Sequence, residues 1–220
     1  NRVEKAYELI ESLKEGKDVA LITDAGTPAI SDPGEVLVGM CIERGIRVTS
    51  LPGASACITA LTLSGLSTRR FVFEGFLPQD KKERRGRLEK LAEESRTIIL
   101  YEAPHHLKRT LSELYEALGE RKLAICRELT KKFETVMHTE LAAAVAYYGE
   151  NEPKGEYVLV LAGRDERELK EIEQAKWEEM SAKEHVAMYE AKGVSRKEAM
   201  KLAAKDRGVS KREIYREVVE

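Results

Sequence analysis

A short apolar run followed by a loop rich in glycine and proline is the feature that most constrains the fold of this chain. The run Asp18–Asp24 is almost wholly apolar between its two aspartates, and the loop Asp24–Gly34 follows it at once. A continuous apolar run of this length predicts a strand covered on both faces, as in a parallel sheet. Helical spacing begins after Gly34, so the loop joins a strand to a helix. We therefore expect an α/β domain with a ligand loop at a strand end, and a plain connecting loop is the alternative.

The rest of the first half continues this alternation of strands and helices. A second strand is predicted at 46–51 and ends in the turn Pro52-Gly53. The helix after this turn would offer free amides to a carboxylate or a phosphate, although an ordinary Pro-Gly turn is the alternative. The helices expected in this half are 1–15, 35–44 and about 55–64.

The second half is richer in strands and predicts a mixed sheet. Its strands are expected at 71–76, 97–101, 122–127, 135–138 and 156–162, and its helices near 82–95, 104–118 and 139–149. After Gly163 the composition changes to charged helix formers. We therefore predict three regions: an N-terminal α/β domain at 1–69, a second α/β domain at 70–164 and a helical extension at 165–220.

The helical extension contains a short repeat. Gly193–Glu198 reads Gly-Val-Ser-Arg-Lys-Glu, and Gly208–Glu213 reads Gly-Val-Ser-Lys-Arg-Glu. Each copy holds Ser-x-x-Glu, the capping box that starts a helix, so two short helices are predicted with Leu202, Ala203, Ile214 and Val218 facing inward. The pair has the scale of a helix-turn-helix that binds nucleic acid, and a plain helical appendage is the alternative.

Composition excludes several classes of protein. The chain has 220 residues, 42% hydrophobic and 35% charged, which is typical of a globular protein and not of a disordered one. No apolar run approaches the roughly 20 residues that cross a bilayer, and the first residues lack the core of a signal peptide. Three unevenly spaced cysteines indicate reduced thiols in a cytoplasmic protein.

The phosphate cradle of ATPases and the dinucleotide fingerprint are both absent from the sequence. Adjacent His105-His106 lack the spacing of a helical zinc pair, so no metal is expected.

Basic residues are concentrated in two segments, although the net charge is only −2. Residues 81–90 hold six basic and two acidic side chains, and residues 192–216 hold nine basic and three acidic ones. Such clusters can bind a polyanion through its phosphates, and a solvated helix face is the alternative for either one. The candidate RNA contacts in these segments are Lys81, Lys82, Arg84, Arg85, Arg196, Lys197, Lys211 and Arg212.

Five segments in order along the chain resemble a known family. They are Asp24–Gly34, Leu51–Ala56, Phe73–Pro78, Tyr101–His105 and Cys126–Lys131. Together they look like the successive motifs of the ribosomal RNA small subunit methyltransferase I family, which belongs to the tetrapyrrole methylases, and the match runs from about Val19 to Gly163. The resemblance implies a two-domain class III methyltransferase fold with a helical C-terminal extension. Members of the family begin with a further strand, a Pro-Gly loop and an acidic segment, so the first domain is expected to be incomplete here.

The resemblance also implies a reaction. It implies binding of S-adenosylmethionine between two α/β domains and transfer of its methyl group to the ribose 2′-oxygen of a cytidine in 16S rRNA of the small ribosomal subunit. Adenine would lie toward the strand at 157–162, and homodimers are common in this fold family. The residues expected to hold the cofactor are Asp24, Ala25, Gly26, Thr27, Ser31, Asp32, Pro33, Gly34, Pro52, Gly53 and Ser55.

A general base would help a ribose hydroxyl to attack the methyl group. The candidates are Glu102, His105 and Glu128, all near predicted strand ends. Each also has a structural alternative, since the two glutamates can pair with Arg or Lys and His105 can cap the helix after Pro104. Arg127 and Lys131, in the same region as Glu128, fit contacts to RNA phosphates better.

Three functions remain open from the sequence. The first is the RNA ribose methyltransferase, in which we expect the extension at 165–220 to position rRNA. The second is a methyltransferase of a tetrapyrrole or of a protein side chain in the same fold, which would not require the two basic segments. The third is a non-catalytic RNA-binding protein, which would leave the loop Asp24–Gly34 unexplained.

Overall fold

The structure is a computed structural model that describes residues 2–177 and 180–219. It divides the chain into two compact units, 1–163 and 164–220. The elements of the first unit are α1 (Arg2–Lys14), α2 (Gly34–Glu43), α3 (Ala56–Leu63), β1 (Phe71–Gly75), α4 (Lys81–Ala92), β2 (Thr97–Glu102), α5 (Pro104–Leu118), β3 (Lys122–Arg127), β4 (Thr135–Glu140), α6 (Leu141–Glu150) and β5 (Tyr157–Leu161).

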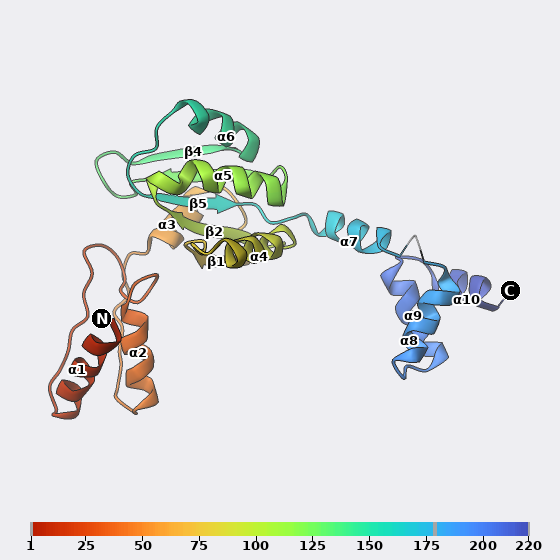
Figure 1. The fold of residues 1–220 in the computed structure, drawn as a ribbon, viewed down its shortest axis with the longest axis horizontal. Helices are drawn as coiled ribbons and strands as arrows, with labels where there is room; N and C mark the ends of the chain where they lie inside the picture. Colours follow the sequence, from red (N-terminus) through yellow and green to blue (C-terminus); the bar gives the residue numbers. More distant parts are fainter. Residues whose placement is uncertain (1, 178–179, 220) are drawn as a thin grey trace. The chain divides into compact units, whose positions relative to one another are not determined.

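The strands form one mixed sheet in the order β1-β2-β5-β3-β4, as the strand-rich second half predicts (Figure 1). β1 pairs with β2 in parallel, and β5 runs antiparallel to both β2 and β3. Strands β1, β2 and β3 therefore point the same way and end at the same edge of the sheet. Tyr157 at the start of β5 lies opposite both Glu102 and Arg127, which fixes the register of this edge.

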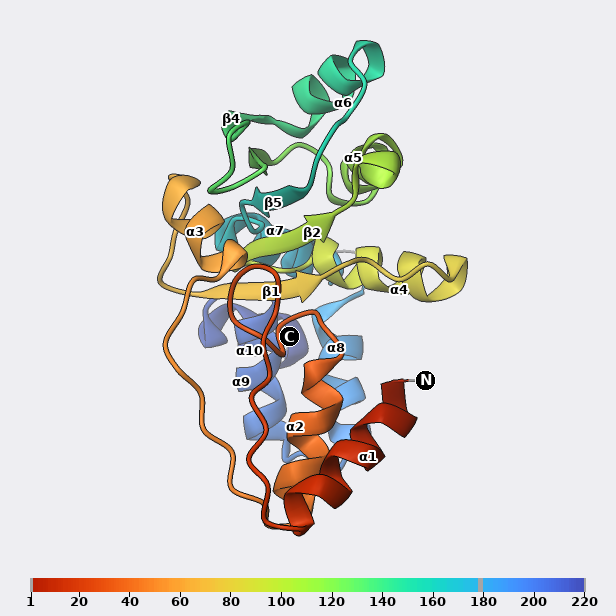
Figure 2. The same cartoon turned by 90° about the vertical axis from the view of Figure 1, so that its left-hand side faces the viewer.

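Helices cover both faces of the sheet, and the alternation of side chains along each strand explains why. Ile98 and Leu100 of β2 pack in the larger core with α4, α5 and α6, whereas Ile99 packs with α3 on the opposite face. Figure 2 shows α3 on one side of β2 and β5, and α4 and α5 on the other. The apolar strands at 97–102 and 157–161 are thus buried on both sides, as their continuous hydrophobic runs require.

The prediction of two strands in the first half, at 18–24 and 46–51, is wrong. Within the described residues both segments are extended but belong to no sheet, and Ile22 and Leu51 are 84% and 83% exposed. Apolar runs become strands only where neighbouring strands accept their backbone hydrogen bonds, and no ladder to either segment forms here. The helices on either side pack on each other instead, with Ile10 of α1 buried beside Leu37 of α2.

The second unit consists of α7 (Glu166–Ala175), α8 (Ala182–Ala191), α9 (Arg196–Asp206) and α10 (Lys211–Val219). Its apolar core lies between α8, α9 and α10, and the predicted inward positions Ala203, Ile214 and Val218 are buried there. Leu202 is only half-buried, because the side chains of α9 that face this core are Ala199, Met200, Ala203 and Ala204.

The predicted capping boxes of the second unit are partly wrong. The box at Ser210 forms, since Ser210 and Glu213 exchange bonds with each other's backbone amides at 3.3 and 2.7 Å. Ser195 makes no side-chain bond to its helix, so the first predicted box is absent. A box that the repeat does not include forms at Ser181 and Glu184.

Among the described residues no helix is long and apolar enough to cross a membrane.

Candidate active site

The five segments singled out in the sequence meet at the edge where β1, β2 and β3 end. Gly75 ends β1, Glu102 ends β2 and Arg127 ends β3, so three of the segments leave the sheet at the same edge. The loop 24–34 reaches the same edge, because a Cβ added at Gly75 would lie 3.0 Å from Ser31 Oγ. Ligands of α/β proteins bind beyond the carboxyl ends of strands, which makes this edge the candidate active site.

Asp32 shapes the loop 24–34. Its two carboxylate oxygens accept hydrogen bonds from the amides of Ala29 and Gly34, at 2.7 and 2.6 Å. Ala29 and Ser31 adopt positive φ angles of 64° and 58°, which cost free energy in residues other than glycine. The carboxylate thus holds a strained backbone in one shape, a condition that recurs where proteins bind ligands.

The structure brings the two predicted ligand loops into direct contact. Thr27 donates to the carbonyl oxygen of Ala54 from its amide, at 2.8 Å, and from its hydroxyl, at 3.0 Å. Gly26 has a φ of 81°, and a Cβ there would lie 3.1 Å from the same carbonyl oxygen. A Cβ at Gly53 would lie 3.0 Å from Thr27 Oγ1. Glycine is therefore required at position 26 for the loops to approach this closely, and Gly53 avoids a tight contact with the Thr27 side chain.

Tyr101, which the sequence analysis did not single out as a site residue, connects the second loop to the sheet. Its hydroxyl oxygen accepts a hydrogen bond from the amide of Cys57 in the first turn of α3, at 3.1 Å. The rings of Phe73 and Phe76 pack edge-on against it, with centroids 4.9 and 5.7 Å away. Burial raises the pKa of Tyr101 to about 12, so its hydroxyl stays protonated at neutral pH. Its signals in the sequence were its place at the start of the segment Tyr101–His105 and beside Glu102.

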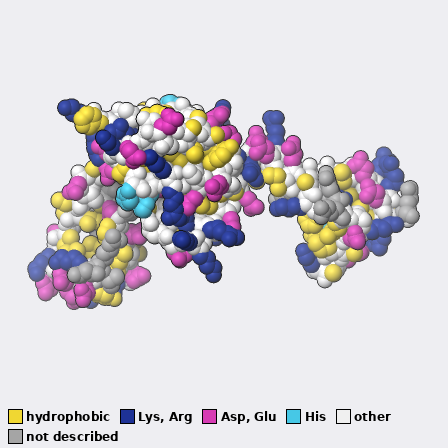
Figure 3. Space-filling view, turned by 45° about the horizontal axis from the view of Figure 1, so that its top comes forward, with side chains coloured by type: hydrophobic (Ala, Val, Ile, Leu, Met, Phe, Trp, Pro, Cys, Tyr) yellow, Lys and Arg dark blue, Asp and Glu magenta, His cyan; other side chains and the backbone are white. Residues whose placement is uncertain are grey.

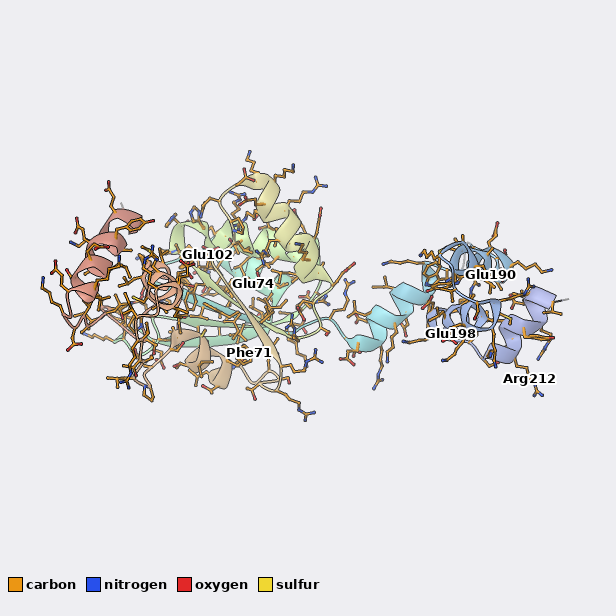
Figure 4. The ribbon with its side chains drawn as sticks, turned by 90° about the horizontal axis from the view of Figure 1, so that it is seen from below. Phe71, Glu74, Glu102, Glu190, Glu198 and Arg212 are labelled. Atoms are coloured by element: carbon orange, nitrogen blue, oxygen red, sulfur yellow. The ribbon has the colours of Figure 1, made fainter. Side chains whose placement is uncertain are left out.

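Glu102, labelled in Figure 4, is buried at the end of β2. One carboxylate oxygen accepts from the amide of Ala103 at 2.8 Å, and the other accepts from the hydroxyl of Thr110. Thr110 in turn accepts from Arg84, at 2.6 Å, and Arg84 pairs with Glu113 at 2.5 Å. A buried hydrogen-bonded chain therefore runs from α4 through α5 to the edge of the sheet.

The other two candidate bases differ in their surroundings. His105 is exposed in the first turn of α5, with its ring 4.0 Å from that of His106. Glu128 accepts from the amide of Glu156 at 2.8 Å and from Lys131 Nζ at 3.1 Å. The Glu156 amide, together with Lys131, holds the pKa of Glu128 below its usual value. The lowered pKa makes Glu128 a weaker base than an ordinary glutamate, and its side chain braces the backbone between β3 and β5.

The predicted RNA contacts fall into two groups by exposure. Arg84 is only 5% exposed, and its guanidinium is bonded to Thr110 and Glu113. The prediction that Arg84 contacts an RNA phosphate is therefore wrong. Arg127 donates to the carbonyl oxygen of Lys154 at 2.7 Å, and Lys131 pairs with Glu128 and Glu156. Lys131 is exposed although it is paired. The other exposed members are Lys81, Lys82 and Arg85 at the start of α4, and Arg196, Lys197, Lys211 and Arg212 at the starts of α9 and α10. Figure 3 shows Lys and Arg side chains gathered beside histidines on one face of the first unit.

The fold and the edge site define a tetrapyrrole methylase. The family model for Tetrapyrrole (Corrin/Porphyrin) Methylases matches residues 1–145. The crystal structure of the methyltransferase CobJ shares the fold with a TM-score of 0.59 and 19% identity, over 74% of this chain and 72% of that one. Uroporphyrin-III C-methyl transferase from Thermus thermophilus, complexed with S-adenyl homocysteine, has a TM-score of 0.52 and 18% identity, over 74% of each chain.

Curated relatives narrow the class to one family. Ribosomal RNA small subunit methyltransferase I of Bacillus subtilis is 46% identical over 98% of this chain and 73% of that protein. The protein of the same name from Halalkalibacterium halodurans is 47% identical over 98% of this chain and 74% of that protein. The Escherichia coli O157:H7 protein is 40% identical over the whole chain and 75% of its own length. The chain belongs to the ribosomal RNA small subunit methyltransferase I family.

Proposed function

We propose that this protein transfers a methyl group from S-adenosylmethionine to the ribose 2′-hydroxyl of a cytidine in 16S rRNA. The observation that carries the proposal is the meeting of five segments at one sheet edge, in a chain 46% identical to a ribosomal RNA small subunit methyltransferase I. The three buried free cysteines fit a reducing cytoplasm, which we include in the proposal together with homodimer formation. The division of the first unit at residue 69 stays a prediction.

The residues at the edge fit S-adenosylmethionine by their chemistry. The loops 24–34 and 51–55 expose backbone groups in a shape fixed by Asp32 and Thr27, whose own polar atoms are already bonded within the protein. We therefore assign Asp32 and Thr27 to shaping the site. The exposed carboxylate of Asp24 suits the ammonium group or a ribose hydroxyl of the cofactor, both of which are donors.

The remaining predicted cofactor contacts act through the backbone in this proposal. Glycine at 26 and 53 lets the two loops lie within contact of each other, and Gly34 leaves room for the side chains of Leu21 and Asp32, so the amides and carbonyls of the loops can approach a ligand closely. Ala25, Ser31, Pro33, Pro52 and Ser55 lie within or beside these turns and would line the cofactor site.

The chain's own residues would then orient the ribose and accept its proton. Bound S-adenosylmethionine supplies a methyl group already activated by the sulfonium charge. Holding the hydroxyl oxygen in line with that methyl group is the main task of the protein. We favour His105 as the group that accepts the hydroxyl proton, because it is exposed at the edge. Glu102 is buried and bonded to Ala103 and Thr110, so its role in this proposal is to order the start of α5 and not to accept the proton.

The substrate part of the proposal relies on exposed positive charge. Lys81, Lys82 and Arg85 stand at the start of α4, where the chain has just left the edge. The second unit adds Arg196, Lys197, Lys211 and Arg212 at two helix starts. Phosphate contacts of this kind position an RNA without reading its sequence. Removing the second unit is expected to reduce the salt slope of RNA binding and to leave cofactor binding intact.

Calorimetry with S-adenosylmethionine tests the cofactor step. We compare the wild type with Gly26→Ala, in which the new Cβ would meet the carbonyl oxygen of Ala54 and separate the two loops. The matched control is Gly39→Ala, since Gly39 lies in α2 with no atom near its Cβ position. Binding by the wild type and the control but not by Gly26→Ala supports the site, and equal binding by all three contradicts it.

Methyl transfer tests the substrate step. Tritiated S-adenosylmethionine is incubated with small ribosomal subunits, and the labelled nucleoside is identified after digestion of the RNA. Labelled 2′-O-methylcytidine supports the proposal, and a label on a tetrapyrrole or a protein side chain would move it to another methylase of this fold. The variant His105→Asn is expected to lower the rate with little change in RNA affinity.

A further inference from the structure

The loop between β3 and β4 is strained and rigid. Glu128 and Thr130 have positive φ angles of 50° and 65°. With Ala29 and Ser31, they are the non-glycine residues of the described chain with this conformation, and both pairs lie in loops at the candidate active site. The amide of Thr130 donates to Glu134 at 2.6 Å, and Lys131 pairs with Glu128 and Glu156. These bonds hold the loop in one shape.

This rigid loop presents an aromatic ring to solvent. Phe133 is 63% exposed and is in none of the apolar clusters formed by the described residues. The ammonium of Lys132 lies 5.6 Å from the centroid of its ring, and Lys131 is two positions before it. The ring therefore adds nothing to the core of the first unit, and the hydrogen-bonded loop holds it in water.

An exposed aromatic ring beside a lysine has the chemistry of a platform for unpaired bases. Nucleobases stack on aromatic side chains, while a lysine such as Lys132 can attract an adjoining phosphate. The ring needs no reordering to accept a base, because the loop is already fixed. A protein partner is favoured less, since flanking lysines are depleted from the centres of protein interfaces.

The loop is also close to the candidate active site. β3 ends at Arg127 and β4 begins at Thr135, and these two residues are paired at the same edge as Glu102. Two strand spacings separate the ends of β2 and β3, which is about 10 Å. A nucleotide stacked on the loop would therefore be a near neighbour of a ribose placed at the edge. Figure 1 shows the β3–β4 loop extending beyond the sheet.

We propose that Phe133 is a stacking platform for an unpaired base of the RNA substrate, with Lys132 contacting an adjoining phosphate. This inference rests on the proposed function, since it presumes an RNA substrate. It adds a binding residue and a chemical requirement: the RNA near the modified nucleotide must be single-stranded when it is bound.

Equilibrium binding of two RNA probes tests the platform. The probes are a short single-stranded oligocytidylate and an abasic RNA of the same length, which keeps the phosphates and lacks the bases. Phe133→Ala is expected to weaken oligocytidylate binding about 5- to 150-fold, without changing abasic binding or the salt slope. Phe133→Trp should retain affinity, and its added fluorescence should be quenched by oligocytidylate. Lys132→Ala should reduce the salt slope by about one.

The control is Tyr115→Ala, which removes another exposed aromatic ring of the first unit, on α5. It should leave both affinities unchanged. If Phe133→Ala binds oligocytidylate as the wild type does, or weakens both probes equally, the platform is overturned and the RNA substrate survives. If the wild type binds neither probe, the RNA substrate of the proposed function is overturned as well.

Discussion

Thr27 gives two hydrogen bonds to a single oxygen, the carbonyl of Ala54, one from its amide at 2.8 Å and one from its hydroxyl at 3.0 Å. This one contact joins two loops that lie 27 residues apart in sequence. It places the turn after Leu51 against the glycine-rich loop although neither loop follows a strand. The geometry of the proposed cofactor site therefore depends on a contact between loops.

Thr27→Val tests this dependence because valine keeps the side-chain shape and removes the hydroxyl. The amide bond to Ala54 remains, so we expect the chain to fold and S-adenosylmethionine to bind about 3- to 10-fold more weakly, as measured by calorimetry. Thr27→Ser retains the hydroxyl and is expected to bind as the wild type does. Equal affinity in all three would mean that the backbone bond alone holds the loops together.

The second half of the first unit could be predicted closely from local patterns. The strand 122–127 and the helix 104–118 have the predicted bounds, because each contains a strong periodic or continuous apolar signal. The strands at 18–24 and 46–51 carried an equally clear apolar signal and do not form. An apolar run reports that a segment tends to be buried, whereas a strand also needs a hydrogen-bonding neighbour, which depends on the rest of the sheet.

The site was predicted less completely than the fold. Loop positions such as Asp24–Gly34 stood out because glycine and proline mark special backbone shapes. The individual roles of the polar side chains could not be predicted, because those roles depend on contacts between residues distant in sequence. Arg84 and Arg85 are adjacent in a basic segment, yet Arg84 is buried against α5 and Arg85 is exposed. Burial of this kind follows from the packing angle of α4, which charge counts do not contain.

Arg84 is expected to stabilise the first unit, whereas its neighbour Arg85 is not. Arg84→Met removes the buried partner of Glu113 and Thr110, and should lower the unfolding free energy by about 3 kcal/mol. Arg85→Met removes only an exposed pair with Glu89 and should change it by less than about 1 kcal/mol. Hydrogen exchange of the α5 amides measures both. A normal exchange rate in Arg84→Met, with a reduced salt slope of RNA binding, would restore Arg84 as a phosphate contact.

His185 makes the stability of the second unit depend on pH. Burial holds its pKa below the usual value, Arg207 lowers it further and Lys192 adds a weaker effect in the same direction, while Asp206 opposes them. His185 is therefore neutral when folded, and the unfolded chain takes up a proton as the pH falls below about 6.5. The unfolding free energy should be full above that pH and should decrease as the pH falls through the lowered value.

Trp177 offers a local probe of this effect, because its ring stacks on His185 with centroids 3.9 Å apart and it is the only tryptophan of the chain. Urea unfolding followed by its fluorescence should show a midpoint that falls between pH 7 and pH 5. His185→Gln is neutral at every pH and should flatten that dependence. The same slope in the variant would assign the effect to another group.

The serines that begin helices α8 and α9 should differ in their contribution to the second unit. The Ser181 hydroxyl accepts a hydrogen bond from the amide of Glu184, and the Glu184 carboxylate accepts one from the amide of Ser181. Ser195 makes no side-chain bond to its helix. Ser181→Ala should therefore cost about 1 kcal/mol of unfolding free energy, and Ser195→Ala only a few tenths, as followed by Trp177 fluorescence. An equal cost would show that Ser195 caps its helix in solution, as its Ser-x-x-Glu sequence predicted.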